Sequence, residues 1–221
     1  NIVDENHRLT KHGENVGRYG THPRFAHMIA SAIELEKEQS GTIALACILS
    51  ALLEERDLFS REQQNDSIDL RKRLYLVQKL KQGQKSGKGG EGRIHAISQQ
   101  ASRLYTQTNA KGDCWRQSLP IEEFTGILLA LAYPERISQC RGQAGKYLAQ
   151  SGKGLSFNAQ DGMALEPAIV AAHMMNFNHQ LIAVLAAPVS FEQLQSLGII
   201  EPKWQENLHY DGSQDRISAR K

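Results

Sequence analysis

Lysine and arginine side chains gather in two stretches of this 221-residue chain, and phosphate binding is the chemistry that such clusters can perform. The first stretch spans residues 71–93, where eight basic residues accompany one acidic residue, for a charge balance of +7. Cations at this density can neutralise phosphates and release the counterions that surround nucleic acid. The candidate phosphate-binding residues of this stretch are Arg71, Lys72, Arg73, Lys79 and Lys81.

A structural explanation of the first stretch stays open beside the functional one. Residues 34–69 carry nine acidic and three basic residues, a balance of −6, and this segment could compensate the cations that follow it. Charge alone favours neither explanation. The segment from Gly83 to Gly92, GQKSGKGGEG, contains five glycines and predicts a flexible connection without helix or strand.

The second basic group belongs to a segment in which glycines punctuate alternating apolar residues. Its candidate phosphate-binding residues are Arg141, Lys146 and Lys153, and Arg136 precedes them. Small β barrels of the OB kind bind single strands on such surfaces and use aromatic rings as stacking platforms. Tyr147 lies within this group, and we favour a buried place in a strand for it over a stacking role. Because only 6% of the chain is aromatic, an extended stacking platform is not expected.

Motifs for nucleotide hydrolysis are absent from the sequence. The pattern GxxxxGK[ST], whose backbone amides surround phosphates, does not occur. Its nearest relative, GQKSGKG at residues 83–89, has too few residues between the glycines and lacks the magnesium-binding hydroxyl. No DEAH-like acidic box follows a strand. The histidines are isolated and no CxxC pair occurs, so we assign no catalytic residue, metal site or cofactor to this chain.

Composition places the chain among globular proteins, with 40% hydrophobic residues and a net charge of +2. No apolar run approaches the roughly 20 residues that span a bilayer, so no membrane partner is expected. Three widely spaced cysteines suit a reducing cytoplasm, which is the predicted localisation, and Cys47 is expected in the core. Because the chain begins with Asn1 and shows no leader pattern, we expect a piece of a longer protein.

Apolar periodicity predicts five helices in the first part of the chain, at about 21–33, 42–56, 66–82, 93–108 and 120–132. Thr21 is expected to cap the first helix. The second is apolar nearly all round and is expected at the centre of the core. Pro134 disfavours a helical conformation for Tyr133, so the fifth helix should end there.

After Pro134 the hydrophobic period changes from about 3.6 to about 2, which indicates strands. They are expected at residues 136–140, 145–150, 154–157, 167–176 and 180–187, with a hairpin turn at 176–179. A short helix at 191–197 and a frayed polar tail from Asp211 should follow. The predicted fold class is α+β: an N-terminal α-helical bundle followed by a small antiparallel β-rich domain, with an OB-like barrel left open as its form.

Three phrases resemble the C-terminal region of the HrpB-type bacterial DEAH-box ATP-dependent helicases. They are LTKHGENVGRYGTHPRFAHMI at residues 9–29, ALACILSALLEERDLF at 44–59 and YPERI at 133–137. The resemblance implies a winged-helix remnant at 1–18, read as a last strand or wing. It further implies a helical helicase-associated (ratchet) domain at 19–135 and a β-rich C-terminal domain at 136–221.

The resemblance also implies an accessory, non-catalytic region that guides single-stranded RNA or DNA, through its phosphates, for motor domains in the same polypeptide. ATP and magnesium would be needed only by those missing motor domains. The eight candidate basic residues would then contact the strand. The alternative is a protein-interaction or structural module that docks the helicase to a partner without binding nucleic acid itself.

Overall fold

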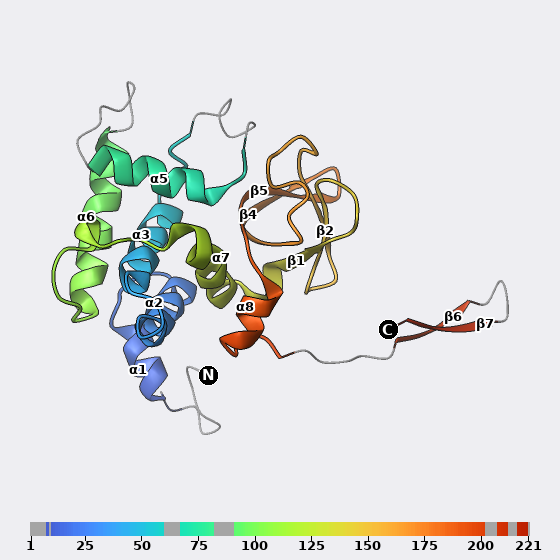
Figure 1. Cartoon of the computed structure of the whole chain (residues 1–221), viewed down its shortest axis with the longest axis horizontal. Coiled ribbons are helices and arrows are strands. Elements are labelled where there is room, and N and C mark those ends of the chain that lie inside the picture. The colour runs from blue at the N-terminus through green and yellow to red at the C-terminus, as the bar shows by residue number, and fades with distance from the viewer. Residues whose placement is uncertain are drawn as a thin grey trace. The chain divides into compact units, whose positions relative to one another are not determined.

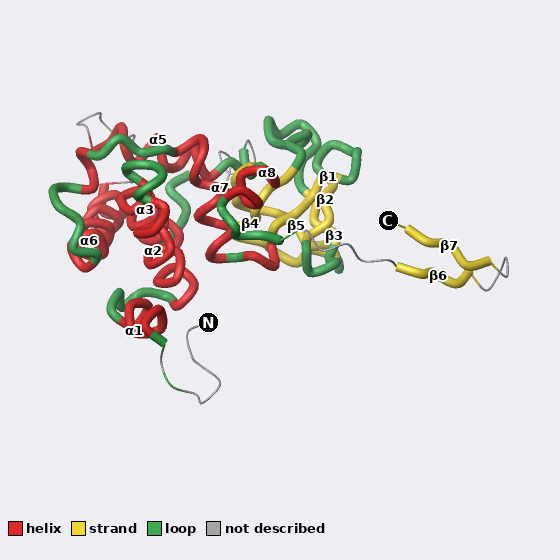
Figure 2. Tube along the Cα trace, turned by 60° about the horizontal axis from the view of Figure 1, so that its bottom comes forward, coloured by secondary structure: helices red, strands yellow, loops and turns green. Residues whose placement is uncertain are grey.

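The computed structural model describes residues 8, 10–59, 67–81, 91–201, 207–211 and 216–220. The chain forms two compact units, Asn1–Ser190 and Phe191–Lys221. Within the first unit the helices form one part and the strands another, as Figure 2 shows in red and yellow. This separation agrees with the α+β class predicted from the sequence.

Among the described residues, six α-helices form the first part of the first unit (Figure 1). They are α1 Lys11–Gly17, α2 Pro23–Leu35, α3 Thr42–Glu54, α5 Leu70–Lys81, α6 Glu91–Gln107 and α7 Ile121–Ala132. Helix α3 is central because it packs against α2, α5, α6 and α7. All residues from Thr42 to Leu53 are buried, as its all-round apolar sequence predicts.

The helix ends follow local chemistry. His22, and not Thr21, caps α2, because its Nδ1 accepts the amide of Arg24 at 3.3 Å. Gly41 precedes α3 with a φ of 89°, and a Cβ there would lie 2.0 Å from the carbonyl oxygen of Ser118, so only glycine fits. Helix α7 ends at Ala132 with Tyr133 as its C-cap, as predicted, and a 3-10 turn at Pro134–Arg136 leads into the strands.

Five strands close into a small barrel in the order β1-β2-β3-β5-β4. They are β1 Ile137–Cys140, β2 Lys146–Ala149, β3 Gly154–Ser156, β4 Ala168–Phe177 and β5 Gln180–Pro188. All five lie within one or two residues of the predicted strands. The barrel is not wholly antiparallel, however. Strands β3 and β5 pair in parallel, with Leu155 opposite Leu181, while the other described pairs in the barrel are antiparallel.

The β4–β5 hairpin turns tightly at Asn178 and His179. These residues have φ values of 48° and 63°, and Phe177 pairs with Gln180 directly before and after them. Two consecutive positive φ angles define a type I′ turn, whose twist matches that of the flanking strands. The turn is therefore shorter than the four-residue one predicted, because Asn176 and Phe177 still belong to β4.

The helices and the barrel pack directly against each other within the first unit. Helix α7 contacts β4 and β5, and Gly126 permits the close approach, since a Cβ there would lie 1.9 Å from the Pro188 carbonyl oxygen. The short segment before α5 also joins the barrel. Asp69 forms a parallel bridge with Ala186, and the side chain of Ile68 lies in the barrel core.

The second unit contains helix α8, Phe191–Ser196, and an antiparallel pair, β6 Asn207–Asp211 and β7 Arg216–Arg220. Helix α8 matches the short helix predicted at 191–197. The frayed tail predicted from Asp211 is wrong for residues 216–220, which form β7. The pairing of β7 with β6 explains the difference, because polar side chains do not prevent a hairpin whose backbone groups bond to each other.

Two further local predictions differ from the structure. Residues 11–17 form helix α1 and not a strand or wing. Glu91 and Gly92 open α6, whereas residues 83–90 of the predicted glycine-rich connection lie outside the described residues. The division of the chain at residues 18 and 135 into three domains stays a prediction.

Candidate nucleic-acid interface

A groove of about 540 Å³ on the surface of the barrel collects cations of the second basic group. The groove is lined by Arg141, Lys146, Tyr147, Lys153, Gly154, Leu155, Ser156, Asn176, His179, Gln180 and Leu181. None of these described lining residues carries a carboxylate. Its volume falls in the range of about 300–1,000 Å³ that is typical of ligand sites.

Three cationic side chains line this groove from different elements. Arg141 follows β1, Lys146 opens β2 and Lys153 precedes β3, and all three are exposed. Burial alternates along β2, so Lys146 faces outward while Tyr147 faces the core. The amide of Arg141 donates to the carbonyl of Lys146 at 2.9 Å, which closes the β1–β2 turn. Barrel closure thus brings together three predicted residues that are spread over thirteen positions of sequence.

The β1–β2 turn depends on Gly145. Its φ is 68°, and a Cβ would lie 2.4 Å from the carbonyl oxygen of Phe157. The amide of Phe157 donates to the carbonyl of Gly145 at 3.0 Å. The glycine therefore lets two backbone segments approach closely beside Lys146.

Tyr147 belongs to the floor of the groove and is 1% exposed. Its hydroxyl is within donor distance of the carbonyls of Met163, at 2.9 Å, and Glu166, at 2.8 Å. Its ring stacks on Phe157 with 5.3 Å between centroids. Burial raises the pKa of Tyr147, so the phenol stays protonated. The buried place favoured from the sequence is confirmed, and Tyr147 offers no free ring to a base.

Arg73 has an internal role. Its side chain is 1% exposed and pairs with Asp57 at 3.1 Å. The guanidinium also donates to the carbonyls of Ser67, at 2.6 Å, and Asp69, at 3.1 Å, and lies 4.1 Å from the ring centroid of Phe59. Because this cation is buried and its donors are used, we withdraw the prediction that Arg73 binds phosphate.

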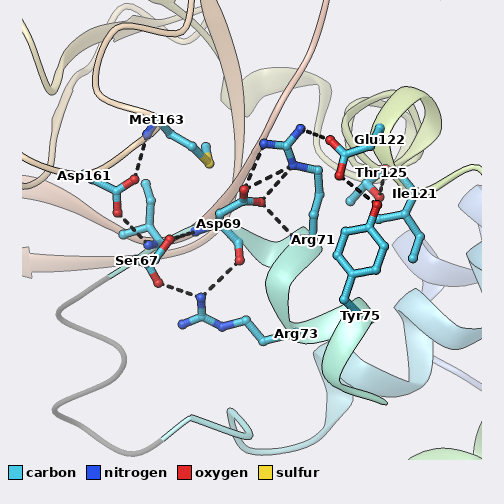
Figure 3. A network of polar contacts seen from close by, with 11 residues as sticks. Ser67, Asp69, Arg71, Arg73, Tyr75, Ile121, Glu122, Thr125, Asp161 and Met163 are labelled. Atoms are coloured by element: carbon cyan, nitrogen blue, oxygen red, sulfur yellow. Dashed lines mark hydrogen bonds and ion pairs between the residues drawn. The ribbon is translucent and has the colours of Figure 1, made fainter. Parts of the chain in front are cut away.

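Arg71 is likewise engaged within the protein, as Figure 3 shows. Its guanidinium pairs with Asp69 at 2.8 Å and with Glu122 of α7 at 2.5 Å. Hydrogen bonding to Asp69 raises the pKa of Arg71. Glu122 also accepts the hydroxyl of Tyr75 at 2.8 Å. Two carboxylates already neutralise Arg71, so its assignment as a phosphate ligand is withdrawn as well.

The remaining predicted residues of α5 are exposed but do not line the groove. Lys72, Lys79 and Lys81 are all open to solvent, and Lys81 lies 5.4 Å from the ring centroid of Trp115. The two basic groups of the sequence therefore do not form one site in the described structure. Lys72, Lys79 and Lys81 stay predicted phosphate ligands, but they have less geometric support than the three cations that line the groove.

Sequence reasoning missed the polar residues that the β4–β5 hairpin brings to the groove. Asn176, His179 and Gln180 line it from the far end of the sheet. The tight turn at these positions was a usable signal, because loops between barrel strands commonly carry ligand contacts.

Arg136, the fourth cation of the second basic group, does not line the groove. Its guanidinium donates to the carbonyl of Ala172 at 2.7 Å and lies 4.1 Å from the ring centroid of Tyr133.

The described residues contain no group of histidine, cysteine or acidic side chains that could hold a metal ion. Cys47 is fully buried, as expected, and burial raises its pKa well above its ordinary value. Burial also raises the pKa of Cys114 to about 11. Neither thiol is therefore suited to act as a nucleophile. Among the described helices, none combines the length and apolar character needed to cross a membrane.

The helical bundle and the five-stranded barrel are together similar in fold to part of two solved helicase structures. No protein-family model matches the chain, and no curated protein sequence matches it. Among solved structures, the crystal structure of the E. coli DExH-box NTPase HrpB superposes with a TM-score of 0.70 and 21% identity. A second crystal structure, the Escherichia coli DEAH/RHA helicase HrpB, gives a TM-score of 0.65 and 21% identity.

Each comparison covers 99% of this chain and 23% of the other, so the chain spans about a quarter of the length of these structures. The resemblance to the HrpB branch that three sequence phrases indicated is confirmed at the level of the fold. The α+β class is confirmed with it. The form of the β-rich part was left open by the sequence, and the sheet closes into a small barrel that is compatible with an OB-like domain.

Proposed function

We propose that this chain is a non-catalytic, nucleic-acid-binding region of an ATP-dependent helicase, and that its OB-like barrel holds single-stranded RNA or DNA. The observation that carries the proposal is the convergence of Arg141, Lys146 and Lys153 on a groove whose described lining has no carboxylate. In this proposal ATP and magnesium serve motor domains of the parent polypeptide, which are also its covalent partners.

Phosphate contact is the chemistry that the groove supports best. Three exposed cations can neutralise phosphates without reading bases, because lysine and arginine heads recognise charge on the backbone. The helical part contributes a rigid support for the barrel, through α7 and the segment before α5. Because the three cations act through charge alone, the affinity of the chain for single strands should be modest and should fall steeply as the salt concentration rises.

A salt titration with fluorescently labelled single-stranded RNA tests the proposal. Three phosphate contacts predict that log K falls against log salt with a slope of about −2. The combined variant Arg141→Glu, Lys146→Glu and Lys153→Glu should lose at least about tenfold in affinity at low salt. The assignment would be contradicted if affinity did not change with salt concentration, or if the combined variant kept the affinity of the unaltered chain.

A matched control comes from α5. The variant Lys72→Glu, Lys79→Glu and Lys81→Glu makes the same change in net charge on a surface outside the groove. We expect it to weaken binding far less than the groove variant. If the α5 variant has the larger effect, the strand lies along α5 and not along the barrel.

Docking to a protein partner is the second candidate, and one observation favours it. Phe177 and Met175, two positions apart at the end of β4 and therefore on one face of the strand, are 58% and 51% exposed. A protein-docking module would show no salt-dependent binding of single strands. The titration above therefore separates the two functions.

A further inference from the structure

A second cavity, of about 250 Å³, adjoins the cationic groove on the barrel. Its lining is Glu135, Arg136, Ala149, Ser151, Lys153, Leu155, Met174 and Leu181. Lys153, Leu155 and Leu181 line both cavities. Leu155 and Leu181 are also register partners across the parallel β3–β5 pair, so the two cavities meet at this seam.

The second cavity differs from the groove in chemistry. Four of its eight lining side chains are apolar, from Ala149, Leu155, Met174 and Leu181, and the other four are polar or charged. These include Glu135, whereas the described lining of the groove has no carboxylate. Arg136 is held in place by the carbonyl of Ala172, and Glu135 is held by two hydrogen bonds from Arg24, at 2.7 and 3.0 Å. Fixed polar groups at an apolar cavity can orient a planar polar ring without a large entropic cost.

The size and position of the cavity restrict its occupant. It is smaller than the roughly 300–1,000 Å³ of sites for drug-sized ligands, so it suits one ring system. Lys153 stands at the junction, where a phosphate on the groove side would lie next to a base on the other side. A polynucleotide supplies both groups at neighbouring positions of one chain.

We propose that this cavity is a base subsite, which takes one unpaired base of the strand whose phosphates lie on Arg141, Lys146 and Lys153. The inference rests on the proposed function and deepens it. The apolar wall removes a face of the base from water, while Lys153 holds the adjoining phosphate. Only an unpaired base can enter, so the subsite selects single strands over duplexes.

The test compares two ligands with equal numbers of phosphates. One is a fluorescent oligothymidylate about ten nucleotides long, within the span of an OB barrel, and the other is its abasic analogue. The full chain should bind the oligothymidylate about fivefold or more tightly at the same salt concentration. Ser151→Leu, which fills the cavity from an exposed turn, should abolish this preference and leave the affinity for the abasic ligand unchanged.

Gln150→Leu is the matched control, because Gln150 is exposed next to Ser151 and lines neither cavity. It should keep the preference. Equal binding of both ligands by the unaltered chain, or a preference that survives Ser151→Leu, overturns the base subsite and leaves the phosphate groove standing. Failure of both ligands to bind even at low salt overturns the proposed function itself, and the subsite with it.

Discussion

Asp161 and Ile68 join the barrel to the helical part of the chain through one buried hydrogen bond. The backbone amide of Ile68 donates to Oδ2 of Asp161 over 2.9 Å, although 93 positions separate the two residues. The other oxygen, Oδ1, accepts the amide of Met163 at 2.8 Å. The carbonyl of Ile68 accepts the amide of Ala186 at 2.9 Å, so the segment before α5 is bonded to the barrel on both sides.

Asp161→Ala should destabilise the first unit by about 1–3 kcal/mol, because it leaves two buried amides without acceptors. Urea unfolding followed by circular dichroism measures the loss. Asn158→Ala is the control in the same loop, since Asn158 accepts an exposed amide of Gln160 at 3.0 Å and should cost much less. Equal losses for the two variants would show that the Asp161 bond contributes little.

Arg73→Met should destabilise the protein by about 2 kcal/mol or more, because the carboxylate of Asp57 loses its partner and two backbone carbonyls lose a donor. Lys72→Met, one position earlier on the exposed face, should change stability by no more than about 0.5 kcal/mol. Denaturant unfolding of both variants gives the comparison. If Arg73→Met leaves the free energy of unfolding unchanged, Arg73 does not have the stabilising role described above, and its assignment as a phosphate ligand is open again.

Gly126→Ala tests the packing of α7 on the barrel. Alanine favours a helix interior by about 0.5–1 kcal/mol over glycine. The clash with the Pro188 carbonyl oxygen at 1.9 Å should outweigh this gain and cost about 1–3 kcal/mol in total. Gly162→Ala, where a Cβ meets nothing within 4 Å, is the control and should be close to neutral. A stabilised Gly126→Ala protein would show that the contact is looser than the structure indicates.

His173 should make stability fall in mild acid. The side chain of His173 is exposed on β4, but partial desolvation of its ring, with the nearby charge of Arg136, lowers the pKa of His173 below its ordinary 6.5. The unfolded chain therefore binds the proton more readily than the folded one. The contribution of neutral His173 is complete above pH 6.5 and is lost as the pH falls through the folded pKa. Because solvent reaches the ring, the effect on stability should be small.

His173→Gln should flatten the stability profile below pH 6.5 relative to the unaltered chain. Urea midpoints measured through this range, with both proteins in the same buffers, give the difference directly. Parallel profiles would show that His173 protonates equally well in both states.

Local sequence determined where the elements lie and where the architecture changes. The all-round apolar stretch at 42–53 indicated a central helix, and Tyr133-Pro134 indicated the end of one. The alternation of apolar and polar residues after Pro134 located all five barrel strands, because side chains of a strand point to opposite faces in turn. The positive charge of the second basic group was visible in the same way, as residue type.

Tertiary structure alone decided which cations are exposed to solvent and which are paired within the protein. Arg71 and Lys72 are neighbours of the same kind in sequence, yet one is paired with Asp69 and Glu122 and the other is exposed, because helix rotation points them to different surroundings. The parallel β3–β5 seam and the groove at Arg141, Lys146 and Lys153 likewise arise only when the barrel closes. Sequence determined the elements because their causes are local, whereas the site depends on contacts between residues far apart in the chain.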